Sequence, residues 1–270
     1  MKNIVIITSN ALRHDYFRIM FGLNPEINVI KSYVEIPKGT DKKKDLSFIE
    51  ENHFLAREKT EHDFFSDIVS SSTDNSNPVK IEKNKINDQS YIDEVKKLDP
   101  DLIITFGCCI IREELLMVFK NKIINVHLGI SPYYLGAGTN FISMVNNDFQ
   151  CTGYTFMFMD QGIDTGEIIH QARAEVCLFD NIHQIGNRLI KDMVHDFIKL
   201  VSNFDFIKKM HPITSNIDPI ICFNRDATQL KTIELYNNFL NGAVKNFLAN
   251  KEEVESRYPI IEQSFMKKIL

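Results

Sequence analysis

Residues 101–129 read DLIITFGCCIIREELLMVFKNKIINVHLG, and this stretch decides the fold predicted for the chain. It holds two short apolar runs, DLIITFG and KIINVHLG, separated by a segment with the spacing of a helix. Runs that are apolar on both faces are typical of parallel strands buried between two layers of helices. Ligands of such sheets bind beyond the carboxyl ends of the strands. The residues that close the two runs, Gly107–Cys109 and Asn125–Gly129, are therefore expected to face a functional site.

The same alternation of strands and helices extends over the first 202 residues. NIVIIT (3–8) predicts a strand, and the segment after it predicts a helix to about Leu23. Between a helix expected over 45–69 and a strand expected from 79, the polar segment SSSTDNSNP (70–78) predicts a mobile surface loop, with a lid over a site as the alternative. The other expected elements are a strand over 28–35, helices over 88–98, 112–119 and 181–201, and a pair of strands joined by the tight connection DQGIDTG (160–166).

These elements predict one α/β domain, residues 1–202, in which a mostly parallel sheet carries helices on both faces. Residues 203–270 begin with a loop that contains Pro212 and Pro219 and continue with a strongly helical segment, 226–255. We expect this second part to be a mainly helical C-terminal extension that serves as the contact of a homodimer or touches a substrate.

Composition argues against several classes of protein. The chain has 270 residues, 31 of them Lys or Arg and 36 Asp or Glu, and its net charge of −5 does not suit a nucleic-acid partner. No apolar run approaches the roughly 20 residues that cross a bilayer. The N-terminal segment has no small-residue cleavage site of a secretory signal, and the five cysteines include no CxxC pair. We therefore expect a cytoplasmic protein with reduced thiols and no role at a membrane.

Three polar side chains stand out against apolar surroundings. Asn125 and His127 lie on one face of a predicted strand, because side chains alternate along a strand, and Asp164 lies in the DQGIDTG turn. An amide can donate to a developing oxyanion, an imidazole can stabilise it or move a proton, and a carboxylate can orient that imidazole. The three residue types together suggest acyl transfer.

Other interpretations of these and neighbouring residues remain open. A strand histidine and an Asp-Thr-Gly turn are also common as purely structural features. A thiol nucleophile at Cys109 is disfavoured, because vicinal cysteines that end a buried strand more often pack as small apolar side chains. Arg13 and His14 suit either contact with an anionic substrate or an exposed helix start. Asp160 and Asp164 have no further ligands at suitable spacing nearby, so we predict no metal site.

Two segments, NVHLGISPYYLGAG (125–138) and MDQGIDTGEII (159–169), resemble the formyltransferase family in sequence and in separation. The resemblance covers about residues 101–176. The family includes glycinamide ribonucleotide transformylase, methionyl-tRNA formyltransferase, amino-sugar N-formyltransferases and formyltetrahydrofolate hydrolases, which share a Rossmann-like domain and use 10-formyltetrahydrofolate. The resemblance therefore implies a one-carbon transferase with that formyl donor.

The resemblance also implies roles for individual residues. Asn125 corresponds to the family's oxyanion-binding asparagine, His127 to its catalytic histidine, and Asp164 to the aspartate that supports the histidine and relays protons. Two segments are expected to form the pterin pocket: Cys109, Ile110, Ile111 and Arg112, and Met159, Asp160, Gln161 and Ile163. The residues expected on the acceptor side are Ser9, Asn10 and Asn140.

Departures from the family pattern reduce the number of acceptor molecules that we expect. The first loop, TSNALRHDYF (8–17), lacks the glycine-rich GxGSN-type loop with which glycinamide ribonucleotide transformylase looks to hold its substrate phosphate. A methionyl-tRNA formyltransferase should carry a C-terminal β-barrel, whereas residues 203–270 look helical. The amine of a small molecule, with a nucleotide-linked amino sugar first, is therefore the expected acceptor. Hydrolysis of 10-formyltetrahydrofolate would use the same three residues, and a non-catalytic folate-binding protein would have no need of them.

Overall fold

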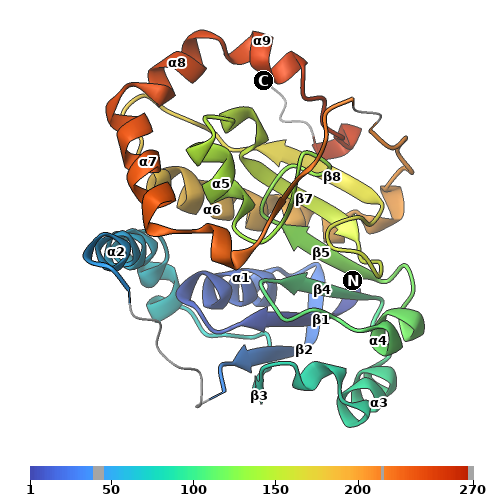
Figure 1. The fold of residues 1–270 in the computed structure, drawn as a ribbon. Helices are drawn as coiled ribbons and strands as arrows, with labels where there is room; N and C mark the ends of the chain where they lie inside the picture. The colour runs from blue at the N-terminus through green and yellow to red at the C-terminus, as the bar shows by residue number, and fades with distance from the viewer. Residues whose placement is uncertain (39–45, 214–215, 267–270) are drawn as a thin grey trace.

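The protein is built on a seven-stranded sheet with the strand order β3-β2-β1-β4-β5-β7-β8 (Figure 1). The computed structural model describes residues 1–38, 46–213 and 216–266. The first five strands in this order are parallel, and β7 and β8 are antiparallel to their neighbours. The predicted α/β fold with a mostly parallel sheet is thus confirmed. The strands are β1 (Lys2–Ser9), β2 (Ile27–Ile36), β3 (Pro78–Glu82), β4 (Leu102–Phe106), β5 (Ile123–His127), β7 (Gly153–Phe158) and β8 (Ile168–Arg173).

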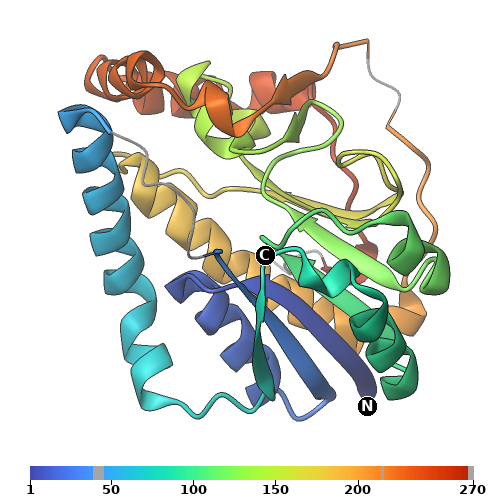
Figure 2. The same cartoon turned by 60° about the horizontal axis from the view of Figure 1, so that its bottom comes forward.

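Helices cover both faces of the sheet, because the strand order reverses between β1 and β4, as in Rossmann-like folds. Helices α1 and α6 pack on one face with α2 outside them, and α3 and α4 pack on the other face (Figure 2). These helices are α1 (Leu12–Leu23), α2 (Phe48–Ser71), α3 (Gln89–Leu98), α4 (Glu113–Val118) and α6 (Ile182–Ser202).

Alternate residues of β1 supply two separate cores. Ile4 and Ile6 point into the core shared with α1 and α6, whereas Val5 and Ile7 point into the core shared with α3 and α4. All four side chains are fully buried. This two-sided burial is the physical reason why the strands read as continuous apolar runs rather than as alternating apolar and polar residues.

The C-terminal extension is helical and packs over the β5–β7–β8 half of the sheet (Figure 1). Its helices arch over α5 (Thr139–Val145), and its short strand β9 (Ile220–Cys222) pairs in parallel with β6 (Tyr134–Gly136). Farther along, the backbone N–H of Gln171 in β8 donates to the carbonyl of Ile261, at 2.7 Å. The extension therefore makes backbone hydrogen bonds to the α/β domain at two places. Its helices are α7 (Gln229–Leu240), α8 (Ala243–Ala249) and α9 (Lys251–Ser256).

The segment 70–78 is not the mobile loop that its composition predicts. Helix α2 continues to Ser71, and the turn that follows is held in place: Ser76 is fully buried, and the Asn77 side chain donates to the carbonyl of Val29, at 3.1 Å. Polar side chains of this kind hydrogen-bond to nearby backbone, which fixes a loop without an apolar core. The turn lies against Gly22 near the end of α1, at the edge of the sheet opposite the carboxyl ends. It therefore cannot cover a site at those ends.

One expected boundary lies among residues that the structure does not describe. The expected start of the second helix, residue 45, is outside the described residues, and α2 is described from Phe48.

No helix within the described ranges is both long and apolar enough to cross a membrane.

The buried ring of Phe197 in α6 provides a test of the larger core. Its centroid lies 4.5 Å from that of Phe156 and 5.6 Å from that of Phe21. We expect Phe197→Ala to lower the free energy of unfolding by about 3–5 kcal/mol in urea denaturation, because it removes a fully buried aromatic side chain. Phe206→Ala, at a site with 70% exposure, is the control and should change it by less than about 0.5 kcal/mol.

Acid should weaken the attachment between β8 and the C-terminal segment. Burial lowers the pKa of His170 from its ordinary 6.5 to about 4, and its Nδ1 accepts a hydrogen bond from the backbone of Gln263. Between pH 6.5 and 4 the unfolded chain therefore binds a proton that the folded chain does not, so stability falls as the pH falls through this window.

The measurement is the free energy of unfolding against pH for the unmodified protein and for His170→Gln, with the exposed His195→Gln as control. The slope should decrease by up to about 1.4 kcal/mol per pH unit in His170→Gln alone. An unchanged slope in that variant would show that His170 does not cause the pH dependence of the free energy of unfolding.

Candidate active site

Strands β4 and β5 place three polar side chains near the carboxyl edge of the sheet. Thr105 lies opposite Asn125 in the parallel register, and His127 follows Asn125 on the same face of β5. Asn125 is partly exposed, whereas His127 is only 5% exposed. The strand therefore presents the amide toward solvent and holds the imidazole below the surface.

The carboxylate of Asp164 joins these side chains. It lies in the turn between β7 and β8 with φ of +54°, a left-handed conformation that Asp tolerates better than most residues. Its Oδ2 accepts the backbone N–H of Gly136 at 2.8 Å and lies 3.1 Å from Nδ1 of His127. Its Oδ1 lies 3.4 Å from Nδ2 of Asn125. The structure thus brings all three predicted catalytic residues together.

The Asn125 amide has a fixed orientation. The hydroxyl of Thr105 donates to its Oδ1 at 2.8 Å, which turns its Nδ2 toward Asp164. Thr105 is the one polar residue within β4 (LIITF), and the sequence analysis did not single it out. A signal was present, because a hydroxyl in an otherwise apolar buried strand needs a hydrogen-bond partner.

The His127 ring is enclosed by acceptor atoms. Its Nε2 lies 2.9 Å from the backbone carbonyl oxygen of Tyr134, opposite the contact between Nδ1 and Asp164. Burial lowers the pKa of His127, and the Asp164 carboxylate and the Tyr134 carbonyl oppose that shift. In this arrangement each ring nitrogen contacts an oxygen atom of the protein. The ring therefore contacts Asp164 directly, and Nε2 can contact a ligand only if the Tyr134 carbonyl moves away from it.

The C-terminal extension supports this arrangement from behind. Gly136, whose N–H binds Asp164, has φ of +97°, and a Cβ at this position would overlap the carbonyl oxygen of Cys222 in β9. Next to it, the N–H of Ala137 donates to the same carbonyl at 2.9 Å. Strand β9 therefore fixes the path of β6, which carries both the Gly136 amide and the Tyr134 carbonyl.

The two segments predicted to form the pterin pocket lie side by side. The side chain of Gln161 donates to Glu113, which follows Arg112, at 2.8 Å. Ile110 and Ile163 are 78% and 56% exposed, respectively, which is unusual for side chains of this type. Both segments therefore offer uncovered apolar surface, and Ile163 is next to Asp164 in the sequence.

Other members of these segments hold the loops in shape. The side-chain amide of Asn87 donates to the carbonyl of Ile110 and accepts from the N–H of Arg112, at 3.0 and 2.8 Å. Ile111 is buried, and Met159 packs at the edge of the same core. Asp160 accepts hydrogen bonds from the Gly162 N–H and the Thr165 hydroxyl, which closes the turn that carries Asp164.

Cys109 has a structural contact rather than the surroundings of a nucleophile. Its backbone N–H donates to the buried carboxylate of Glu35 at 2.6 Å, and the same carboxylate accepts the N–H of Asn84 at 2.7 Å. Burial and the hydrogen bond to Glu35 raise the pKa of the Cys109 thiol to about 12, and burial also raises the pKa of Cys108. Neither thiol is activated as a thiolate.

The three residues expected on the acceptor side differ in their surroundings. Ser9 ends β1 at the carboxyl edge of the sheet, and Asn10, which follows it, is exposed. The Asn140 amide is engaged on both sides, because it donates to the carbonyl of Gly153 at 2.9 Å and accepts its N–H at 3.0 Å. Both polar atoms of the Asn140 side chain thus tie α5 to β7.

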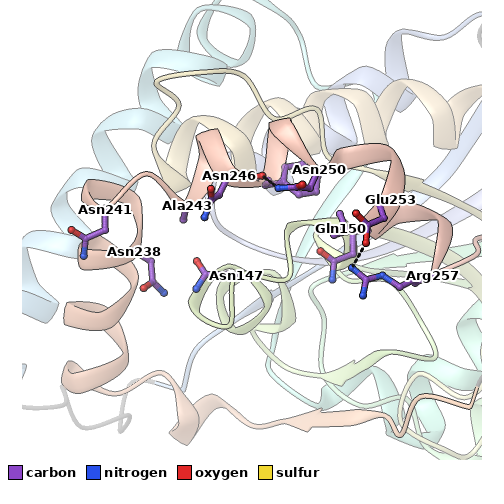
Figure 3. Close-up of a pocket in the computed structure, with 11 residues that line it drawn as sticks. Asn147, Gln150, Asn238, Asn241, Ala243, Asn246, Asn250, Glu253 and Arg257 are labelled. Carbon is purple, nitrogen blue, oxygen red and sulfur yellow. Dashed lines mark hydrogen bonds and ion pairs between the residues drawn. The ribbon is translucent and has the colours of Figure 1, made fainter.

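A pocket of about 510 Å³ lies apart from these residues, between the loop after α5 and the arch of α7, α8 and α9 (Figure 3). None of the three predicted catalytic residues lines it. Its lining is rich in neutral amides, and Gln150 at its base donates to Asp148, which accepts the hydroxyl of Tyr134. The pocket therefore lies beside residues that hold Tyr134 in place, and not beside the three predicted catalytic residues. No cluster of metal-ligating side chains occurs within the described parts of the chain.

Comparisons with known proteins agree with this geometry. A model of the formyl transferase family matches residues 47–201. A methionyl-tRNA formyltransferase from Finegoldia magna is 33% identical over 126 residues, which are 46% of this chain and 37% of that protein. Another, from Clostridioides difficile, is 40% identical over 100 residues, 36% of this chain and 31% of that protein. The chain thus matches about a third of the length of these two curated relatives.

Solved structures share the fold at low sequence identity. A sugar N-formyltransferase from a Shewanella species has a TM-score of 0.56 at 14% identity and covers 87% of both chains. A phosphoribosylglycinamide formyltransferase from Anaplasma phagocytophilum has a TM-score of 0.55 at 17% identity, with 83% of this chain and 98% of that chain covered. Because the family model spans more than half of the 270 residues and includes Asn125, His127 and Asp164, the chain belongs to the formyl transferase family.

Proposed function

We propose that this protein is an enzyme that transfers the formyl group of 10-formyltetrahydrofolate to the amine of a small molecule. The observation that carries this proposal is the hydrogen-bonded group formed by Asn125, His127 and Asp164 at the carboxyl edge of the sheet, within a chain of the formyl transferase family. An amide donor, a carboxylate and an imidazole are the groups that acyl transfer to an amine requires.

The residues beside Asp164 suit a flat, partly apolar donor molecule. Ile110 and Ile163 offer exposed apolar side chains, and the hydrogen bond between Gln161 and Glu113 holds their two loops together. Cys109–Arg112 and Met159–Ile163 would hold the pterin ring, with the aliphatic side chains against its faces. The donor, when bound there, supplies an activated formyl group.

In the transfer step, the amine of the acceptor attacks the formyl carbon, and negative charge develops on the formyl oxygen. Asn125 Nδ2 donates a hydrogen bond to that oxygen, and Thr105 keeps the amide from rotating away. The amine loses a proton as the new C–N bond forms, and the carboxylate of Asp164 accepts it. The proton then moves to the departing nitrogen, so the protein ends the cycle in its starting state.

His127 supports the carboxylate during this transfer. Its Nδ1 lies 3.1 Å from Asp164, so the pair can share a proton and limit the charge that Asp164 carries at each stage. If Tyr134 releases Nε2, the same ring can face the formyl oxygen as a second donor. Either role places His127 in direct contact with the groups that exchange protons.

The acceptor is assigned by elimination, with a nucleotide-linked amino sugar as the first candidate. The loop at Ser9–His14 lacks the glycine-rich sequence expected for a glycinamide ribonucleotide acceptor. The described part of residues 203–266 forms helices and one short strand rather than the β-barrel expected for tRNA. Methionyl-tRNA is the second candidate, because the curated relatives that match part of this chain are methionyl-tRNA formyltransferases.

Binding of the donor can be tested before the acceptor is known. A non-reactive 10-formyltetrahydrofolate analogue at 100 times its dissociation constant should add about 2.7 kcal/mol to the free energy of unfolding. Ile163→Glu places a carboxylate on the proposed pterin surface and should abolish this gain, whereas Ile217→Glu, outside that surface, should retain it. The absence of any gain in the unmodified protein would contradict the proposed donor.

Transfer and hydrolysis are distinguished by their products. With 10-formyltetrahydrofolate and a panel of amines that begins with amino-sugar nucleotides, we expect formylated amine and little free formate. Formate released at the same rate without any amine would instead assign the protein as a hydrolase.

The hydroxyl of Thr105 should matter for rate more than for binding. Thr105→Val keeps the size of the side chain but removes the hydrogen bond that orients Asn125, so we expect kcat to fall about tenfold with little change in the KM for the donor. Thr105→Ser should restore most of the rate. Asn125→Ala and His127→Asn should lower kcat by about a hundredfold or more. If Thr105→Val matched the unmodified enzyme, this orientation of Asn125 would not be needed.

A further inference from the structure

A line of titratable side chains on α2 faces the rest of the domain. His53, Arg57 and Glu61 are spaced four residues apart and therefore lie on one face of the helix. Opposite them lie Arg13 at the start of α1, His183 at the start of α6, and Tyr236 on α7. Four helices thus direct polar side chains into one region.

The ion pairs in this region leave one guanidinium without a partner. The carboxylate of Glu61, which is 7% exposed, accepts both the side chain and the backbone N–H of Arg13, at 2.8 and 2.9 Å. Arg57 is partly buried one turn away, and no residue in the described ranges forms a hydrogen bond or an ion pair with it. Burial and the charge of Arg13 lower the pKa of Arg57, and the carboxylates of Glu61 and Glu58 partly oppose that shift without contacting the guanidinium.

Neutral hydrogen-bonding groups surround this cation. The rings of His53 and His183 lie 4.8 Å apart, and the hydroxyl of Tyr236 is 3.1 Å from Nδ1 of His53. Burial lowers the pKa of both histidines, that of His183 to about 4, so the rings are uncharged at neutral pH. Because Glu61 is hydrogen-bonded to Arg13, the carboxylates of Glu61 and Glu58 act on the positive charge of Arg57 at longer range and not through a direct contact. A partly buried, unmatched charge of this kind is costly unless an anion completes it.

The region adjoins the carboxyl edge of the sheet. His14, beside Arg13, packs edge to face on Phe106 at the end of β4, at 4.9 Å, and lies directly over Gly107. On the opposite side, the ring of Phe141 in α5 lies 5.7 Å from that of His53. Arg57 is close enough to His14 to lower the pKa of that ring, and His14 packs on the last residue of β4, the strand whose Thr105 orients Asn125.

We propose that Arg57, with Arg13 beside it, binds a phosphate-type anionic group of the acceptor molecule. Two guanidinium groups and the nearby imidazole and hydroxyl donors match the several oxygens of such a group. The assignment of the anion to the acceptor molecule rests on the proposed formyl transfer, whereas the anion site itself does not. The site uses side chains of α2 and α1, so it needs no glycine-rich loop.

The first experiment is calorimetric titration with pyrophosphate at fixed pH and ionic strength. Arg57→Gln is compared with Lys59→Gln, which removes the same charge two residues along α2 from a side chain that is 77% exposed. We expect pyrophosphate to bind the unmodified protein and Lys59→Gln alike, and to bind Arg57→Gln about tenfold or more weakly. Arg57→Lys, which keeps the charge but loses the forked donors, should fall between them.

Two results would overturn the site. One is the absence of pyrophosphate binding to the unmodified protein at millimolar concentration. The other is equal weakening in Arg57→Gln and Lys59→Gln, which would mean general attraction to a charged surface. Thermal unfolding of each variant without ligand shows whether it is folded, and if Arg57→Gln is not, Arg57→Lys against Lys59→Gln decides.

A second titration asks which molecule carries the anion. With the 10-formyltetrahydrofolate analogue bound, the affinity for pyrophosphate should be unchanged if the anion belongs to the acceptor. Competition between the two would overturn that assignment, because the site would then hold the carboxylates of the folate. If the analogue does not bind at all while pyrophosphate still needs Arg57, the proposed formyl transfer fails and the anion site stands.

Discussion

The carboxylate of Asp164 is the interaction on which the candidate site depends. It receives the N–H of Gly136 and lies within 3.4 Å of donors on both His127 and Asn125, so one group links β5, β6 and the turn after β7. In the sequence, α5 and β7 separate the turn from β5 and β6. Without the carboxylate, Nδ1 of His127 and the Gly136 amide would each lose a partner, and a missing partner costs more than an ordinary hydrogen bond gains. The contacts that bring the three predicted catalytic residues together are therefore also contacts that hold the local fold.

That arrangement also explains why the C-terminal extension is joined so closely to the α/β domain. Strand β9 closes against Gly136, where only a glycine fits, and the carbonyl of Cys222 binds Ala137. The extension thereby fixes the short strand that carries two of the contacts around His127 and Asp164. A substitution in β9 would consequently affect the candidate site by shifting the backbone of Gly136 and Ala137, and not by changing a side chain of the site.

The sequence predicted the sheet well, because a strand covered on both faces must be apolar throughout, and that property is local. It also predicted Asn125 and His127 on one face of a strand, from alternation, and singled out Asp164 in the DQGIDTG turn, before the resemblance implied a role for each of the three. It did not identify Thr105 as a partner, because the register between β4 and β5 decides which residues face each other. The segment 70–78 was misread for a related reason: its polar side chains bind backbone far away in sequence, which composition does not reveal. Arg57 could not stand out either, because its lack of a partner follows from Glu61 being taken by Arg13.

The protons around His127 show how the site is prepared for transfer. Nδ1 faces a carboxylate oxygen and Nε2 faces a carbonyl oxygen, and both of these oxygens only accept. A neutral imidazole carries a single N–H, so one of the two contacts lacks a proton, whereas a charged ring would satisfy both. Burial disfavours the charged ring, and Asp164 and Tyr134 favour it. Burial is the larger effect and lowers the pKa of His127, so the ring is neutral in this arrangement and one of its two contacts lacks a proton. In the proposed transfer, a proton released by the attacking amine would complete that contact.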